Sequence, residues 1–356
     1  MRRNDQDDAP RAAPAGAGDP DAGDPDAPLG SYWRAKHAVA QLLRDAARAL
    51  GTGAAGASGA PGPSAVGALL DELKARLAED RFQLVVLGQF KRGKSSLMNA
   101  ILGRPLLPTG IVPVTTAVTA VRHGARGRAL VRRADRALVE EVPLAALPEF
   151  VTEAGNPGNR KQVLSVTVEA PAAFLRRGLC FVDTPGVGSA LDQNTAATLA
   201  FLPEADAAIF VTSADGPLSG AELDLLDQVH GHVQRLFFVL NKIDQVPDEQ
   251  RAELVSYTSG LLARHLGVEA VRLFPLSATQ ALAAEPGSRQ ALASGLPALE
   301  AALATLLGDD RQTVFLVSVL DHAIAAFAEA RLELARRVDE RLPAPGEAGA
   351  EHGQGA

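Results

Sequence analysis

Residues 88–96 read Gly-Gln-Phe-Lys-Arg-Gly-Lys-Ser-Ser, and this stretch decides the fold class. An apolar run at 82–87 precedes it, and a helical pattern beginning at Leu97 follows it at once. A strand, the spacing G-x-x-x-x-G-K-S and a helix form the context that a phosphate-binding loop requires. The alternative interpretation, a glycine-rich turn with an exposed lysine, is disfavoured by the strand and helix on either side.

Each residue type in this loop has a task in phosphate binding. Gly88 and Gly93 let the backbone wrap around phosphate groups, while N–H groups at the start of the helix point at the negative charge. Lys94 would bridge the outer phosphates, and the hydroxyl of Ser95 would ligate Mg²⁺. Ser96, in the first turn of the helix, is counted with these nucleotide-binding residues.

A second candidate segment, residues 183–186, reads Asp-Thr-Pro-Gly and directly follows an apolar run at 179–182. At the end of a strand, Asp183 can hold Mg²⁺ through water, and the Gly186 N–H can bond the γ-phosphate. An Asp-initiated turn would have the same local sequence. Taken alone, this segment leaves both interpretations open.

The third segment, residues 241–244, reads Asn-Lys-Ile-Asp and indicates which base is bound. The carboxylate of Asp244 can accept hydrogen bonds from both N1–H and the N2 amino group of guanine, whereas adenine offers no such pair of donors. A buried polar site that the wrong base leaves unpaired rejects that base strongly. We therefore assign Asn241, Lys242 and Asp244 to guanine-nucleotide binding.

Two further elements complete the expected order. Ser277 and Ala278, after the apolar run 271–275, fit a backbone N–H contact with guanine O6. A threonine on a mobile segment between the phosphate loop and Asp183 should close over Mg²⁺ and the γ-phosphate. Residues 113–116 lie in that interval, and within them Thr115 is the residue that we choose.

Thr109 and Thr116 are the alternatives to Thr115, since a lone loop threonine is ordinarily only a turn residue. Chance agreement of all five segments in order is negligible. The sequence thus predicts a GTPase that takes GTP as substrate, releases GDP and uses Mg²⁺.

The wider pattern predicts an α/β fold. Nearly continuous apolar runs, separated by helical patterns, indicate a mostly parallel central sheet covered by helices on both faces. The pattern from 117 to 142 is shorter, more basic and strand-like, and we expect this stretch to form an antiparallel edge. The apolar runs lie at 82–87, 163–169, 179–182, 207–211, 236–240 and 271–275.

Composition narrows the class of protein further. The formal net charge of −7 gives no support for nucleic-acid binding, which normally leaves a basic footprint. Cys180 is the single cysteine, so an intramolecular disulfide is excluded, and its apolar neighbours predict burial. The N-terminus lacks the apolar core of a signal peptide, and the apolar stretch 313–327 is too short to span a bilayer. We expect a cytoplasmic protein.

The sequence around these motifs resembles that of bacterial dynamin-like proteins. The resemblance covers roughly Phe82 to Leu307 and rests on residues 88–103, 107–115, 183–189, 194–195 and 201–207. It implies an enlarged P-loop GTPase domain on a helical neck built from segments before and after it. It also implies GTP hydrolysis, commonly after two GTPase domains pair across the nucleotide, and membrane remodelling or tethering through a long helical stalk.

Helical patterns on both sides of the domain match such a neck. We divide the chain into a disordered segment at 1–30, neck helices with a Gly/Pro linker at 31–80, the GTPase domain at 81–307, a neck helix at 308–342 and a disordered tail at 343–356.

Two departures from the family pattern matter. The stalk and membrane-binding tip are expected to be missing, so the chain is either a truncated piece or a natural short member. The phosphate loop carries a basic pair, Lys91 and Arg92. One hypothesis is that either residue supplies positive charge to the transition state, as an arginine finger does. The alternative is a solvated pair that only raises the nucleotide association rate.

The leading functional prediction is a dynamin-type module that forms a homodimer through its GTPase domains or pairs with a second dynamin-like chain. It would contact the inner membrane face peripherally, through the missing stalk. The second prediction is a regulatory switch that controls a partner protein without remodelling membranes. A third, an assembly factor acting on RNA, is disfavoured by the acidic charge balance.

Overall fold

The computed structural model describes most of the chain between residues 28 and 341. The described ranges are 28–49, 65–110, 118–136, 138–176, 178–184, 202 and 205–341.

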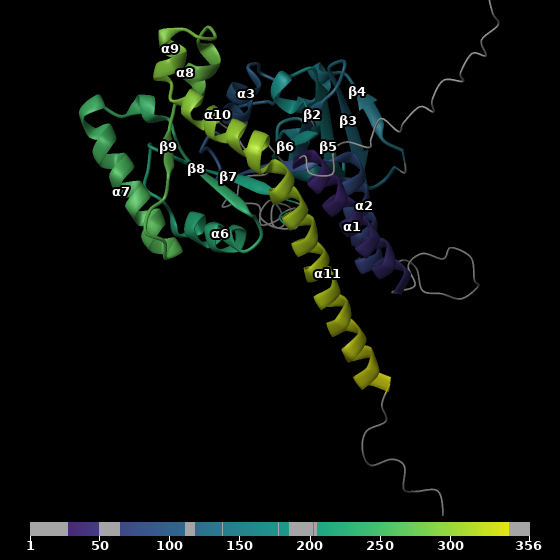
Figure 1. Cartoon of the computed structure of the whole chain (residues 1–356). Helices are drawn as coiled ribbons and strands as arrows, with labels where there is room; N and C mark the ends of the chain where they lie inside the picture. The colour runs from purple at the N-terminus through teal and green to yellow at the C-terminus, as the bar shows by residue number, and fades with distance from the viewer. Residues whose placement is uncertain are drawn as a thin grey trace, which may run out of the picture.

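A nine-stranded sheet forms the centre, with the order β4-β3-β5-β2-β6-β1-β7-β8-β9 (Figure 1). The strands are β1 Phe82–Leu87, β2 Val118–His123, β3 Arg128–Arg133, β4 Glu140–Val142, β5 Val163–Ala170, β6 Leu179–Asp183, β7 Ala207–Ser213, β8 Arg235–Asn241 and β9 Leu273–Pro275.

The half of the sheet from β6 to β9 is entirely parallel. Every side chain of β1 and β7 is buried, which explains why these strands read as unbroken apolar runs. The predicted α/β class with a mostly parallel sheet is confirmed. At the other edge, β4 pairs antiparallel with β3, and β3 with β5.

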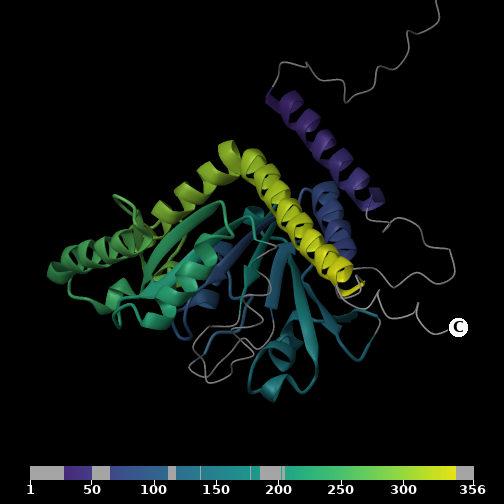
Figure 2. The ribbon, with the colours of Figure 1, turned by 90° about the horizontal axis from the view of Figure 1, so that it is seen from below.

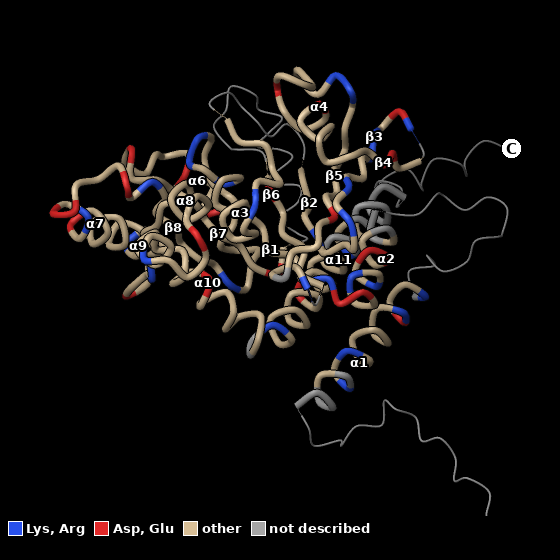
Figure 3. The backbone as a smooth tube through the Cα atoms, turned by 90° about the horizontal axis from the view of Figure 1, so that it is seen from above, with Lys and Arg blue, Asp and Glu red and all other residues tan. Residues whose placement is uncertain are grey.

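The placement of β2 differs from the prediction. We expected all of 117–142 to form the antiparallel edge, but β2 lies inside the sheet, parallel to β5 and antiparallel to β6. Its burial alternates along the strand because only one face is deeply covered. The basic residues of the true edge are paired locally, as in Arg126–Glu141 and Arg128–Glu141, and Figure 3 shows blue and red residues interspersed there.

Helices cover both faces of the sheet. Side chains of α6 and α7 pack with Val85 and Phe210 on one face, and those of α3, α8 and α10 pack with Leu84 and Val86 on the other. Their bounds are α3 Lys94–Leu102, α4 Pro148–Val151, α6 Gly220–His230, α7 Asp248–Leu266, α8 Ala278–Ala283, α9 Arg289–Ala293 and α10 Leu296–Thr305.

Three helices outside this domain lie side by side, as Figures 1 and 2 both show. They are α1 Pro28–Ala49, α2 Ala65–Glu79 and α11 Arg311–Arg341, and each packs against the other two. A π-helical turn at Leu306–Asp310 joins α10 to α11. These helices occur where the sequence predicts them.

The apolar side chains of α11 differ in exposure along the helix. Val317 and Ile324 are exposed, whereas Phe315, Val319 and Ala323 are buried. These buried side chains belong to the same apolar cluster as Leu70 and Leu73 of α2.

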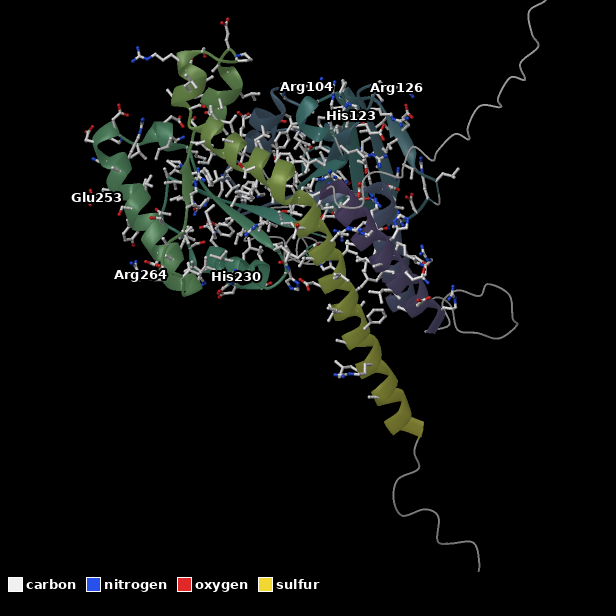
Figure 4. The ribbon with its side chains drawn as sticks, in the orientation of Figure 1. Arg104, His123, Arg126, His230, Glu253 and Arg264 are labelled. Carbon is white, nitrogen blue, oxygen red and sulfur yellow. The ribbon has the colours of Figure 1, made fainter. Side chains whose placement is uncertain are left out.

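In the part of the chain that the structure describes, no helix has the length and apolarity needed to cross a membrane. The same residues contain no group of three His, Cys, Asp or Glu side chains placed to hold a metal ion. Two of the histidines, His123 and His230, lie over different parts of the molecule (Figure 4). Cys180 is buried, as its apolar neighbours predicted.

Candidate nucleotide-binding site

The phosphate loop leaves the carboxyl end of β1 and enters α3. Gly88 has φ 148°, and a Cβ there would lie 2.2 Å from the carbonyl oxygen of Val211 in β7. Gly93 caps α3 with φ 91°, and its Cβ would meet Nδ2 of Asn241 at 2.3 Å. Glycine is therefore required at both positions, because φ is positive and neighbouring atoms leave no room for a Cβ.

The side chain of Lys94 folds back into this loop. Its Nζ donates to the carbonyl oxygens of Gly88, at 3.1 Å, and Gln89, at 3.3 Å. Burial lowers the pKa of Lys94 to about 8, although Asp183 and Glu222 oppose the shift. The loop thus holds a desolvated amine surrounded by backbone groups, which is the arrangement that a phosphate anion would stabilise.

A hydroxyl and a carboxylate meet beside the loop. Ser95 Oγ, on the first turn of α3, donates to Asp183 Oδ2 at the end of β6 over 2.6 Å. Asp183 is buried, and the next residue, Thr184, is tied to the carbonyl of Val86 at 2.9 Å. Oxygen ligands of this kind suit Mg²⁺, so the donor set fits that ion.

Asn241 lies between two loops and contacts both. Its Nδ2 donates to the carbonyl of Arg92 at 3.0 Å, and its Oδ1 accepts from the Ala278 N–H at 3.1 Å. The amide therefore links the phosphate loop to the segment that the sequence assigned to guanine O6. In the structure, Asn241 acts as a positioning residue for these two loops.

Asp244 lies on a short 3-10 turn, Ile243–Gln245, directly after Lys242, whose φ is 61°. Its Oδ1 is buried and accepts no hydrogen bond from the described residues. A buried acceptor without a donor is destabilising, so this oxygen suits a ligand that brings an N–H group. Ser277 is fully buried and caps α8 by accepting from the Gln280 N–H at 3.3 Å.

The two basic residues of the loop, Lys91 and Arg92, lie in different surroundings. Lys91 is exposed, with φ 66°, and its Nζ lies 5.4 Å from the centre of the Phe90 ring. Arg92 is held by Glu222, with its Nη2 and Oε2 2.6 Å apart. This pairing disfavours the hypothesis that Arg92 reaches a transition state and leaves Lys91 as the exposed cation of the two.

The sequence analysis missed the acidic partners of this loop. Glu222 binds Arg92, and Asp215 accepts from Lys242 at 2.6 Å. Hydrogen bonds from Lys242 and Ser213 lower the pKa of the Asp215 carboxyl, against an opposing effect of partial burial. A signal for Glu222 exists, because Ser219-x-x-Glu222 before an apolar run is the pattern of a helix capping box.

Most of the predicted site residues converge at the carboxyl edge of β1, β6 and β8. Gly88, Gly93, Lys94, Ser95 and Ser96 lie in the loop and the first turn of α3. Asp183, Asn241 and Ala278 each contact that loop or a residue bound to it. Thr115, with its alternative Thr116, and Gly186 lie outside the described residues.

Comparison with known proteins adds three kinds of similarity. Residues 84–243 match the family model described as the dynamin family. A protein of Caldicellulosiruptor sp., described as uncharacterized, is 37% identical over 214 residues, which are 60% of this chain and 53% of that protein. The isoniazid-induced protein IniA of Mycobacterium tuberculosis is 34% identical over 165 residues, 45% of this chain and 26% of IniA.

The Bacterial dynamin-like protein of Nostoc punctiforme is 29% identical over 291 residues, 74% of this chain and 42% of that protein. A solved structure described as an oligomerised bacterial dynamin pair matches with a TM-score of 0.55 and 17% identity, over 86% of this chain and 58% of that one. At that identity the match concerns the fold alone. The chain spans about half the length of the first of these relatives and about a quarter of IniA.

Proposed function

The central part of this chain is a GTPase domain of the bacterial dynamin-like proteins, and from this premise we propose that the chain binds GTP and GDP with Mg²⁺ and hydrolyses GTP. One observation carries the proposal. A phosphate loop, a hydroxyl–carboxylate pair and a buried carboxylate oxygen lie at the same edge of the sheet. Ligands of open α/β sheets bind at this carboxyl edge.

In this proposal the loop binds and orients the triphosphate. Lys94 and the N–H groups at the start of α3 would hold the β- and γ-phosphates, which explains why the amine is kept inside the loop. Ser95, Asp183 and Thr115 would hold Mg²⁺, which neutralises phosphate charge when it is bound. Gly186 would bond the γ-phosphate.

The guanine would lie between the segments after β8 and β9. Asp244 would accept from N1–H and the N2 amino group, and Ala278 would donate to O6. Asn241 and Lys242 would keep these segments and the phosphate loop together, as their contacts with Arg92 and Asp215 suggest. Lys91, the exposed cation of the loop, would add positive charge to the transition state.

Dimerisation and movement of the neck form the second part of the proposal. We infer that nucleotide binding pairs two GTPase domains, of this chain or of this chain and a second dynamin-like chain. The similar fold described as an oligomerised bacterial dynamin pair that senses and tethers membranes supports this inference. The packing of α1, α2 and α11 against one another supports a neck that moves as one body.

We extend the proposal to the cell by analogy with these relatives. The protein would work in the cytoplasm and touch the inner membrane face peripherally. Tethering or remodelling of that membrane would be its task.

Turnover measured at several protein concentrations tests this function. The proposal predicts Mg²⁺-dependent release of phosphate from GTP, with a rate per molecule that rises with protein concentration. It also predicts that light scattering finds a dimer with GDP and aluminium fluoride and a monomer without nucleotide. A flat rate per molecule and a monomer in both states would instead favour the regulatory switch, and no turnover at all would contradict the enzyme assignment.

Replacing Lys91 tests its role in the transition state. Lys91→Ala should lower kcat at saturating GTP by about tenfold, because it removes a charge near the reacting phosphate. Unchanged turnover would exclude Lys91 from the transition state.

A further inference from the structure

The side chain of Arg92 uses all three of its nitrogens within the protein. Its Nε and Nη2 donate to the two carboxylate oxygens of Glu222, at 2.9 and 2.6 Å. Its Nη1 donates to Ser213 Oγ at 3.0 Å. Nη2 also reaches the side-chain oxygen of Gln89 at 3.3 Å and the carbonyl of Pro217 at 3.2 Å. The guanidinium could therefore reach a phosphate only by breaking a bidentate ion pair.

Glu222, the partner of Arg92, is buried. The Glu222 side chain is 0% exposed, and that of Arg92 is 11% exposed. Removing one member of such a pair leaves the other charge buried without compensation, which is strongly unfavourable. The pair is therefore a fixed feature of the site rather than an exchangeable surface contact.

Glu222 also belongs to the N-terminal cap of α6. Its Oε2 accepts from the Ser219 N–H at 2.9 Å, while Ser219 Oγ accepts from the Glu222 N–H at 3.2 Å. This reciprocal arrangement fixes the carboxylate in the first turn of the helix. Arg92 is thus attached to a rigid element of the domain.

The main chain around Arg92 needs such an anchor. Its neighbours Lys91 and Gly93 both have positive φ, 66° and 91°. A residue other than glycine in this region is strained, and the strain persists only where the surroundings over-determine it. The Arg92 carbonyl is held by Asn241 and its side chain by Glu222, so both parts of the residue hold the loop in shape.

The same network reaches the guanine side of the site. Arg92 Nη1 lies 3.5 Å from an oxygen of Asp215, whose other oxygen accepts from Lys242. The loop that grips phosphate and the segment that selects the base are therefore connected through one set of ion pairs.

We propose that Arg92 and Glu222 form a clamp that holds the phosphate loop in its nucleotide-binding shape, and that Glu222 is a positioning residue for the phosphates. The proposal rests on the proposed function, because it concerns the same nucleotide. The clamp lowers the free energy of the competent loop before any ligand arrives, so its effect lies in nucleotide binding and not in the chemical step.

Glu222→Gln tests the clamp most directly. Glutamine keeps an acceptor for the Ser219 N–H but loses the charge that Arg92 requires. A charge-assisted pair contributes enough for its loss to weaken GDP binding and raise the KM for GTP by at least about tenfold, with kcat within about twofold of wild type. GDP affinity, KM, kcat and melting temperature are measured together on the full chain.

Ser219→Ala is the matched control, because it removes the Oγ of the same helix cap, with its 3.0 Å hydrogen bond to Glu222 Oε2, but keeps the charge of Glu222 and its pair with Arg92. It should lower the melting temperature and leave KM near the wild-type value. Arg92→Ala should reproduce the KM effect of Glu222→Gln, and the double variant should be no weaker than the weaker single variant, because both changes break one interaction.

Three outcomes would overturn the clamp. Equal KM increases in Ser219→Ala and Glu222→Gln would show a general effect of helix capping. A loss of kcat at unchanged KM in Arg92→Ala, with Glu222→Gln like wild type, would place Arg92 in the transition state. Additive single effects would show that the two residues act separately. Failure of the wild-type chain to bind GDP would instead overturn the proposed function itself, which makes the two failures distinguishable.

Discussion

The ammonium group of Lys94 lies inside the phosphate loop. It is buried against the carbonyl oxygens of Gly88 and Gln89, and burial lowers its pKa to about 8. In the folded protein without ligand, the amine therefore begins to lose its proton just above neutral pH. Bound phosphates would favour the charged form, so binding above this pH would require proton uptake.

The affinity for GDP should consequently depend on pH with a definite sign. Below about pH 8 Lys94 is already charged and affinity should be flat, whereas above it affinity should fall by about tenfold per pH unit. Calorimetric titrations between about pH 7 and about pH 9 measure this slope. Lys94→Arg is the control, since guanidinium keeps its charge throughout and should remove the slope. A flat profile for the wild-type protein would contradict the assignment.

At the scale of elements, the phosphate loop and the start of α3 depend on Gly93. Gly93→Ala places a methyl group against the Asn241 amide at a backbone conformation that alanine tolerates poorly. We expect the variant to lose measurable GDP binding and about 2 kcal/mol or more of stability. Gly103→Ala, at the other end of α3, is the matched control. Its φ is also positive, but nothing lies within 4 Å of the new Cβ, so it should cost about 1 kcal/mol and leave binding intact.

The attachment of α2 to the domain depends on a buried ion pair. Arg76 Nη2 lies 2.8 Å from Asp206 Oδ1, with side chains 1% and 0% exposed. Asp206 also accepts from the Gln83 N–H at 2.7 Å, so one carboxylate ties α2 to the start of β1. His322 of α11 lies 3.5 Å from Arg76 in the same cluster.

Arg76→Ala should therefore destabilise the protein by about 3–5 kcal/mol, because it leaves Asp206 buried without its partner. Lys74→Ala on the same helix removes a more exposed pair with Asp71 and should cost less than about 1 kcal/mol. Denaturant unfolding of both variants measures the difference. Equal losses of stability would show that Arg76 contributes no more than a surface charge.

Local sequence patterns predicted the elements but not their partners. β1 and β7 are recognisable because buried parallel strands read as apolar runs, and the loop at 88–96 is recognisable from its own spacing. The interior place of β2 depends on which strands it pairs with, and that order is not written in a local pattern. The Arg92–Glu222 pair joins residues 130 positions apart, so the loop sequence alone made Arg92 look like a free cation.

In the whole molecule, the proposed nucleotide site and the neck helices are joined through the central strands. β7 begins beside Asp206, which binds α2, and ends at Ser213, which binds Arg92 of the phosphate loop. A fully buried strand thus runs from the neck to the proposed nucleotide site (Figure 1). This connection is the physical basis for proposing that nucleotide state and neck position influence each other.

In the proposed function this chain selects guanine through one carboxylate, that of Asp244, and calorimetry with GDP and ADP measures this selection. The wild-type protein should bind GDP at least about a hundredfold more tightly than ADP, because adenine leaves Asp244 unpaired. Asp244→Asn should lose this preference and gain affinity for xanthosine diphosphate, whose second carbonyl accepts from the new amide. Equal affinities for GDP and ADP, or a base preference unchanged in Asp244→Asn, would contradict the account.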